Sequence, residues 1–160
     1  MTRVNLVPVA ELHDQHLFAE WRELKMIPKS LIRSLAALDG YKFGFPPERA
    51  RQLILAALIR KIPKEYVLNK GHVYFFYDKG AYLRERYRVL GNELWLRGYE
   101  FNADSPLDPD GVYDTYPELC GNYEPTPAAL ALIRERIAER VAMKPEWYRK
   151  TPVDLAGLRA

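Results

Sequence analysis

The 160-residue chain has a single cysteine, Cys120, and no CxxC pair. One thiol cannot form an internal disulfide, and without paired cysteines a thiolate zinc site is excluded. This cysteine usage is typical of a reducing cytoplasm, so we expect a cytoplasmic protein in which Cys120 is an unreactive loop residue. No apolar run approaches the roughly 18 residues that a membrane-spanning helix needs, so no membrane partner is expected. The first residues do not form a secretory signal.

Positive charge is missing from residues 100–128, which contain seven acidic residues and no Lys or Arg. The other residues carry the 24 basic side chains against 14 acidic ones, so the small net charge of +3 conceals a basic body. A basic body with a separate acidic segment favours a polyanionic partner such as a nucleic acid. A solvated surface with one acidic excursion explains the same numbers, and charge alone does not decide between the two.

No pair of alternating strands, no internal repeat and no low-complexity tract is present, whereas helical periodicity recurs along the chain. We expect helices over residues 12–24, 29–38, 47–60, 80–97 and from Thr126-Pro127 to a break at Pro145. Pro28 ends or kinks the first of them. Residues 61–77 are expected to be partly extended, and the acidic segment to be a loop. The sequence therefore predicts one all-α, compact domain of about three main helices plus shorter helices and long irregular loops.

Several side chains have a structural interpretation that we prefer to a functional one. Core positions are expected for an aromatic cluster of His72, Tyr74, Phe75, Phe76 and Tyr77. A solvated face, with phosphate contact as the alternative, is expected for Arg84, Arg86 and Arg88. On the last helix an apolar stripe is formed by Leu130, Ile133, Ile137 and Val141. Elsewhere on the surface of that helix lie Arg134, Arg136 and Arg140.

One polar face of the first helix has three interpretations. His13, His16, Glu20 and Glu23 are spaced three, four and three residues apart, so they lie along one side. The face is either solvated, or a metal site of His and carboxylate ligands, or part of an active site in which Glu23 acts as an acid/base or stabilises a cation. The helix by itself does not decide among them.

The second residue offers a different chemistry. The small side chain of Thr2 favours removal of Met1, which would leave Thr2 with a free α-amine. Such an amine has a pKa of about 7.7–8.0, far below the roughly 10.4 of a lysine, so it is more often neutral and nucleophilic. A neutral amine can form a Schiff base with an aldehyde-like carbon. Neighbouring Arg3 and Arg22 would favour the neutral form.

Three separated blocks of the chain resemble one family. The blocks read "MTRVNLVPVAELHDQHLFAEWREL", "GHVYFFYDKGAYLRERYRVLGNELWLRGY" and "GNYEPTPAALALIRERIAERVAMKPEWYRK". In this order they are similar to the phage-type endonuclease V family, the pyrimidine-dimer DNA glycosylases and abasic-site (AP) lyases, and they cover more than half the chain.

The resemblance implies a role for individual residues. Thr2 matches the nucleophile, whose α-amine attacks the sugar C1′, and Glu23 matches the catalytic carboxylate that stabilises the developing sugar cation. Positions that hold phosphates and sugar near the lesion are matched by Arg3, Gln15, His16 and Arg22, the last beside the reacting groups. The aromatic-basic tail that engages the dimer and the backbone is matched by Tyr148, Arg149 and Lys150.

The chain departs from the family pattern in three places. Met26 stands where the family has Arg, with Lys25 as a possible substitute for DNA binding. The tail after Lys150 lacks two aromatic residues that relatives often carry. Residues 28–70 contain an insertion, whose helix is either a packing element or a means of altering the DNA footprint.

Together these features predict a DNA repair glycosylase with AP-lyase activity. The expected substrate is double-stranded DNA with cyclobutane pyrimidine dimers, other damaged pyrimidines or abasic sites, and the protein is expected to be a bacterial or viral monomer formed by one domain, residues 1–160. No metal and no organic cofactor is implied. The alternative is a non-catalytic DNA-binding module, or a related glycosylase/lyase acting on another lesion.

Overall fold

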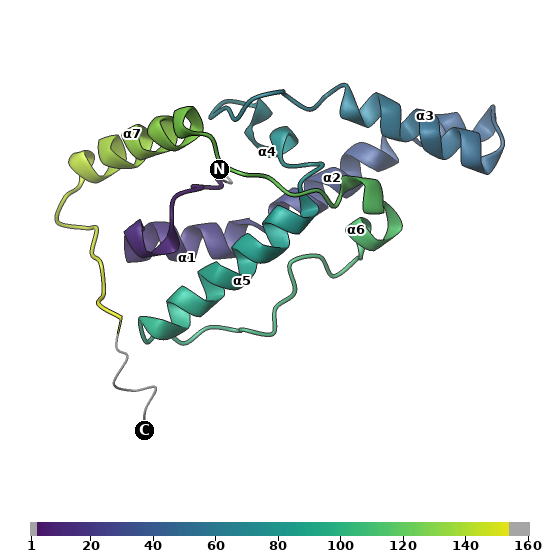
Figure 1. Cartoon of the computed structure of the whole chain (residues 1–160). Helices are drawn as coiled ribbons and strands as arrows, with labels where there is room; N and C mark the ends of the chain where they lie inside the picture. Colours follow the sequence, from purple (N-terminus) through teal and green to yellow (C-terminus); the bar gives the residue numbers. More distant parts are fainter. Residues whose placement is uncertain (1–2, 154–160) are drawn as a thin grey trace.

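The protein folds as an array of helices without a sheet. The computed structural model describes residues 3–153 (Figure 1). The α-helices are α1 (Asp14–Glu23), α2 (Met26–Ala36), α3 (Pro47–Ile59), α4 (Gly71–Phe75), α5 (Gly80–Leu96), α6 (Val112–Thr115) and α7 (Pro127–Met143). Three short 3₁₀ helices are η1 (Val9–Glu11), η2 (Asp39–Phe43) and η3 (Pro117–Leu119). Within residues 3–153 the only β-type pairing is an isolated bridge between Lys79 and Cys120, so the all-α prediction is confirmed.

The five longest helices agree closely with those predicted from periodicity, but two segments differ. Residues 71–75 form α4 where a partly extended chain was expected. The acidic segment contains α6 and η3 where only a loop was expected. Helix α6 can form because the Asp108 carboxylate accepts hydrogen bonds from the backbone N–H groups of Val112 and Tyr113, and Gly111 adopts a φ of 66° before it. None of the helices in the described part of the chain has the length and apolar character to span a bilayer.

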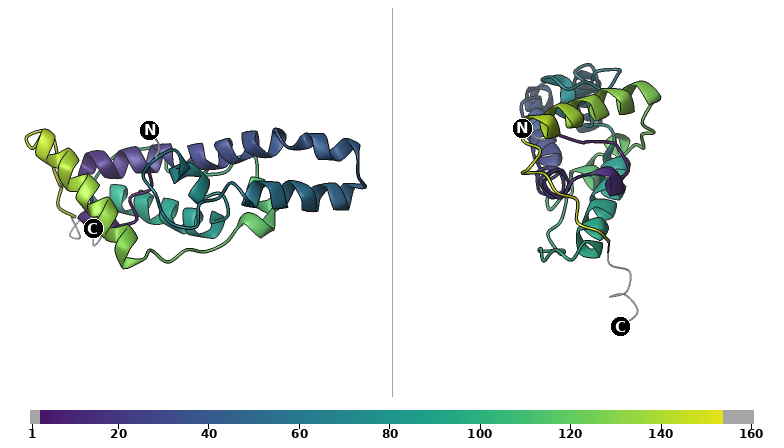
Figure 2. Two further views of the ribbon diagram at one scale, coloured as in Figure 1. Left: turned by 90° about the horizontal axis from the view of Figure 1, so that it is seen from above. Right: turned by 90° about the vertical axis from the view of Figure 1, so that its left-hand side faces the viewer.

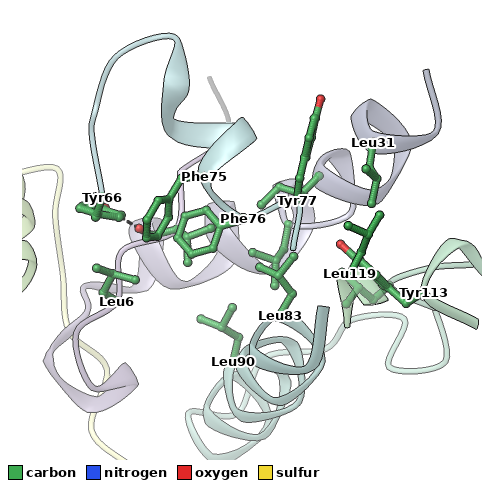
Figure 3. Close-up of a cluster of buried hydrophobic side chains, with 14 of the residues drawn as sticks. Leu6, Leu31, Tyr66, Phe75, Phe76, Tyr77, Leu83, Leu90, Tyr113 and Leu119 are labelled. Carbon is green, nitrogen blue, oxygen red and sulfur yellow. Dashed lines mark hydrogen bonds between the residues drawn. The ribbon is translucent and has the colours of Figure 1, made fainter. Parts of the chain in front are cut away.

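The core lies where α1 and α5 pack together beneath the aromatic residues of α4. Phe75 and Phe76, with Tyr77 after them, are buried among leucines of α2 and α5 (Figure 3). The Tyr77 hydroxyl is 2.7 Å from Ser30 Oγ and 2.9 Å from Ser34 Oγ, which satisfies its polar atom inside the core. The predicted core positions of the aromatic cluster are confirmed, except that Tyr74 is exposed.

Arg86 of α5 and Arg97, the residue that follows α5, are buried in ion pairs with α1. Arg86 Nε lies 2.6 Å from Glu20 Oε2, and Arg97 Nη1 lies 2.9 Å from Asp14 Oδ1. The prediction that Arg86 lies on a solvated face is therefore wrong. Arg84 and Arg88, its partners in that prediction, are exposed and pair with Asp114 and Glu85.

Helices α2 and α3 project from the body as a hairpin, with η2 at its far end (Figure 2). Helix α2 follows α1 after only Leu24 and Lys25, both in the right-handed helical region. Pro28 lies in the first turn of α2, where a missing N–H breaks no helical hydrogen bond. The sequence led us to expect that Pro28 would end or kink the first helix and that the second helix would begin after it. Instead, Pro28 is part of a nearly continuous helical rod formed by α1 and α2. We call residues 26–61 the arm.

Candidate active site

The side chains of Tyr66 and His72 hold the backbone of the N-terminal segment at Val4. We call this pair of residues the clamp. The Val4 N–H donates to His72 Nε2 over 2.8 Å, and the Tyr66 hydroxyl donates to the Val4 carbonyl over 2.7 Å. His72 Nδ1 lies 2.8 Å from the Val67 carbonyl, so Nδ1 carries the proton and Nε2 is free to accept. Burial lowers the pKa of His72, which keeps the ring in this neutral form.

The next residues are fixed against α1 and α5. The Asn5 N–H donates to Glu20 Oε1 over 3.1 Å, and Arg86 donates from Nη1 to the Val7 carbonyl over 2.6 Å. Leu6 between them has a φ of 58°, a strained value for a branched side chain. Strain of this kind persists only where the surroundings determine it, so residues 4–7 are positioned rather than loosely attached.

A cavity of about 280 Å³ opens beside this segment. Its lining comes from the N-terminal segment, α1, α7 and the C-terminal tail, and consists of Arg3, Asn5, His16, Ala19, Glu20, Glu23, Arg136, Ile137, Arg140 and Tyr148. Glu20 is committed to Arg86, so Glu23 is the other carboxylate of the lining. Burial, and then the charge of Arg136, lowers the pKa of Arg3, which reflects the concentration of positive charge around the cavity.

The tail returns across the start of α1 and closes one side of the cavity. Gln15 accepts a hydrogen bond from the Arg149 N–H over 3.2 Å and donates to the Trp147 carbonyl. The Asp14 N–H donates to the Arg149 carbonyl over 2.8 Å. These contacts place the Tyr148 ring on the His16 ring, with a centroid distance of 4.8 Å and an interplanar angle of 24°.

The comparison with known protein families matches residues 1–107 to pyrimidine dimer DNA glycosylases. The chain belongs to this family. The matched part is more than half of the chain and contains the N-terminal segment, α1 and the clamp. A pyrimidine dimer DNA glycosylase is a DNA repair enzyme and acts on damaged DNA.

Four of the residues predicted for this glycosylase come together in the cavity, namely Arg3, His16, Glu23 and Tyr148. Gln15 is not in the lining and instead holds the tail. Arg22 is exposed, with its guanidinium 5.2 Å from the centroid of the Phe18 ring. Lys25 donates to Ser105 Oγ over 2.6 Å and lies over the Trp21 ring. Arg149 and Lys150 are exposed on the tail. Thr2 lies outside the described residues.

Two arginines of the cavity were not predicted as site residues. Arg136 and Arg140 of α7 face α1 across the cavity. The sequence contained a usable signal, because both residues flank Ile133 and Ile137 at helical spacing, so they share the side of α7 that packs inward. Polar residues directly beside an apolar stripe lie at the edge of the core, which is where Arg136 and Arg140 line the cavity.

Burial favours the neutral form of His16 in α1 and of His13, the residue that precedes the helix. Burial is the main cause that lowers the pKa of His16 to about 4, with the charges of His13 and Arg3 acting in the same direction. The pKa of His13 is lowered as well, again mainly by burial. Across residues 3–153 no three His, Cys, Asp or Glu side chains converge as metal ligands, and Glu20 is bound to Arg86. On the polar face of α1, Glu20 is therefore held in a structural ion pair, whereas His16 and Glu23 line the cavity.

Proposed function

We propose that the protein is a bifunctional DNA glycosylase and AP lyase that uses the α-amine of Thr2 as its nucleophile and Glu23 as its catalytic carboxylate. One observation carries the proposal. Glu23 and Arg3 line the same cavity, and Arg3 is joined directly to Thr2 in the chain. The clamp on Val4 supports it, because a nucleophile at the start of a chain is effective only when the backbone that follows it is held in place.

The proposed chemistry has two stages. The Thr2 nitrogen bonds to C1′ of the damaged nucleotide, and the bond between C1′ and the base breaks, so that the base departs with the bonding electron pair. The sugar then opens to an imine between Thr2 and C1′. Loss of a proton from C2′ is followed by rupture of the bond between C3′ and its oxygen, so the 3′ phosphate leaves and the strand is nicked. Water hydrolyses the imine and releases the enzyme.

The surroundings suit an amine of this kind. An α-amine has a pKa of about 7.7–8.0, and positive neighbours lower it further by repelling the protonated form. Arg136 and Arg140 on α7 supply such charges around the cavity, and both can bind phosphate. Glu23 is half-buried in the same lining, where an anion stabilises an oxocarbenium-like sugar more strongly than it would in open water.

The proposed substrate is duplex DNA that contains a cyclobutane pyrimidine dimer or an abasic site, bound by a monomer. The stacked rings of His16 and Tyr148 form an uncharged aromatic wall beside the arginines, suited to the face of a base. A glycosylase/lyase with a different lesion preference is the second candidate. Met26, which stands where the resemblance calls for Arg, is 41% exposed near the end of α1, and this observation favours the second candidate.

Borohydride trapping tests the proposal. Protein whose intact mass confirms that it begins at Thr2 should give a covalent adduct with abasic-site DNA, because borohydride reduces the imine to a stable amine. Protein that retains Met1 is the matched control and should give far less adduct. If the processed protein gives no adduct, the lyase proposal fails. Comparing base release from dimers and from other damaged pyrimidines decides between the two substrate candidates.

A further inference from the structure

The tip of the arm exposes three aromatic side chains within five residues. Phe43 is 93% exposed, Phe45 47% and Tyr41 37%. They lie at η2 and the turn that follows it, at the end of the hairpin farthest from the body (Figure 2). Exposed aromatic surface is unfavourable in water at about 25 cal/mol per Å², so a cluster at a projecting tip indicates a surface that binds something.

The arm that carries this tip is strongly basic. Residues 26–61 contain seven Lys or Arg and two acidic residues, Asp39 and Glu48. Asp39 pairs with Lys42 at the tip. Exposed basic side chains are provided on α2 by Lys29 and Arg33, one helical turn apart, and on α3 by Arg49. The complement to this charge is a polyanion, and the complement to the tip is a set of flat apolar faces.

We propose that the arm is a second DNA-contacting element, in which Phe43 and Phe45 insert between or stack on bases of the duplex that flanks the lesion. Duplex DNA offers both complements at once, since its phosphates attract the basic helices and its base steps accept apolar wedges from the minor groove. The inference rests on the proposed function only in taking DNA as the partner, and it needs no catalytic step.

The direction of α1 and α2 places the tip away from the cavity. The rod is nearly continuous from Glu23 to Ala36, thirteen residues, which at 1.5 Å per residue corresponds to about 20 Å. One base pair occupies about 3.4 Å of the duplex axis, so the tip would reach DNA roughly six base pairs or more from the reacting nucleotide. The arm therefore extends the footprint to one side of the lesion.

A second copy of the chain fits this tip less well. An aromatic side chain buries about 150–250 Å² at most, so three partly exposed ones fall short of the roughly 800 Å² that each partner of a stable interface contributes. Two arms of like charge would also repel each other. Neither objection applies to DNA, which supplies the opposite charge.

Binding to duplexes of two lengths tests the arm. The probe is DNA with one tetrahydrofuran abasic analogue, which has no C1′ leaving group, flanked by twelve or by three base pairs on each side. We expect the double variant Phe43→Ala/Phe45→Ala to bind the long duplex about tenfold more weakly than the parent, equivalent to about 1.4 kcal/mol. The two proteins should bind the short duplex equally. Equal binding of the long duplex would overturn the proposal.

The control variant is Trp95→Ala, which removes an aromatic side chain that is 60% exposed on α5 and should leave both affinities unchanged. Loss of a dimer, or of binding to anionic vesicles, in the tip variant without any change in DNA affinity would assign the tip to another partner and reject the inference. The trapping experiment keeps the two proposals apart. A parent protein that forms the imine while the tip variant binds normally refutes only the arm, whereas the reverse result refutes only the chemistry.

Discussion

At the residue scale, Glu23 is distinguished from its neighbour Glu20 by what surrounds it. Both lie on α1 and both contribute to the cavity, but Glu20 is fully buried and bonded to Arg86, whereas Glu23 is half-buried. Glu20→Gln would therefore report on folding and Glu23→Gln on chemistry.

We expect Glu23→Gln to lower the rate of base release by about 10²–10⁴-fold, because the neutral amide no longer stabilises the sugar cation or accepts protons. DNA affinity should remain within a few-fold of the parent. Single-turnover cleavage of dimer-containing duplex measures the first quantity and fluorescence anisotropy the second. Glu85→Gln, an exposed carboxylate on α5, is the control. Parent-like cleavage by Glu23→Gln would remove this residue from the mechanism.

His16 makes stability depend on pH. Burial holds its pKa at about 4 in the folded protein, below the usual value near 6.5, so the unfolded chain binds the proton first as the pH falls. The contribution is complete above pH 6.5 and is lost as the pH falls toward 4. His16→Gln should reduce the loss of unfolding free energy between pH 6.5 and 4.5 by on the order of 1 kcal/mol, allowing for solvent screening. Urea titrations at both pH values measure it, and an unchanged slope with pH would contradict it.

The sequence contained the cavity residues only in part. Glu23 and His16 were placed on one helix face by spacing alone, and the family resemblance added Arg3 and Tyr148. The burial of Arg86 was missed because its partner Glu20 is 66 residues away along the chain. Periodicity indicates which side of a helix faces inward but not which residues of other elements pack against that side.

At the scale of elements, the ion pair between α1 and α5 does more than join two helices. Arg86 also donates to the Val7 carbonyl, and Glu20 accepts from the Asn5 N–H, so one pair fixes α1, α5 and the N-terminal segment together. Removing one partner leaves a buried charge without its complement.

We expect Arg86→Met to lower the free energy of unfolding by about 3–5 kcal/mol, since the Glu20 carboxylate remains buried and unpaired. The double variant Glu20→Leu/Arg86→Met should be less destabilised than Arg86→Met alone. Arg88→Met, two residues away and exposed, should change stability by less than about 1 kcal/mol. Chemical denaturation gives all three values. A double variant no better than the single one would show that packing, and not charge, dominates.

The clamp predicts a separation of binding from catalysis. Tyr66→Phe removes the hydroxyl that donates to the Val4 carbonyl and should destabilise the protein by about 1–3 kcal/mol. It should also lower kcat for strand nicking several-fold while KM stays near the parent value, because the N-terminal segment loses position and DNA contacts remain. Tyr74→Phe, an exposed tyrosine on α4, is the control. Equal kcat values for both variants would argue against a positioning role for the clamp.

Helix positions were predictable where periodicity extended over several turns, and short helices were not. The boundaries of α3 and α5 lie within one residue of those expected, because proline and glycine punctuate their ends. Helices α4 and α6 have five and four residues, too few to show a period. Their formation depends on tertiary contacts and on the cap from Asp108, which a local pattern does not reveal.

At the scale of the whole molecule, charge is separated in space as well as in sequence. The arginines of α7 line the cavity, the arm adds further basic residues, and the acidic segment supplies partners such as Glu118 to Arg51. The counts favoured a polyanionic partner but did not decide against a solvated surface, and the family resemblance was needed to predict DNA. The sequence did not predict that the basic residues occupy both a cavity and a projecting arm, because that distribution follows from how α2, α3 and α7 pack.

DNA affinity should fall steeply with salt, because each phosphate contact releases condensed counterions. The double variant Arg136→Ala/Arg140→Ala should reduce the slope of log K against log salt by about two, at roughly 0.9 for each lost contact. Arg84→Ala, paired with Asp114 on another surface, should leave the slope unchanged. Anisotropy titrations at salt concentrations from about 50 to about 300 mM measure this slope. An equal slope in the cavity variant would move the phosphate contacts elsewhere.

The backbone clamp on Val4 has a practical consequence for anyone who prepares this protein. The backbone is held at Val4, three residues after Met1, and the neighbouring Arg3 already borders the cavity. If this cavity binds the substrate as proposed, an affinity tag fused in front of Met1, or the few residues that a protease leaves after tag removal, would start from that border and compete with substrate for the same space. A recombinant sample purified in this way could look well folded by every spectroscopic criterion and still be inert.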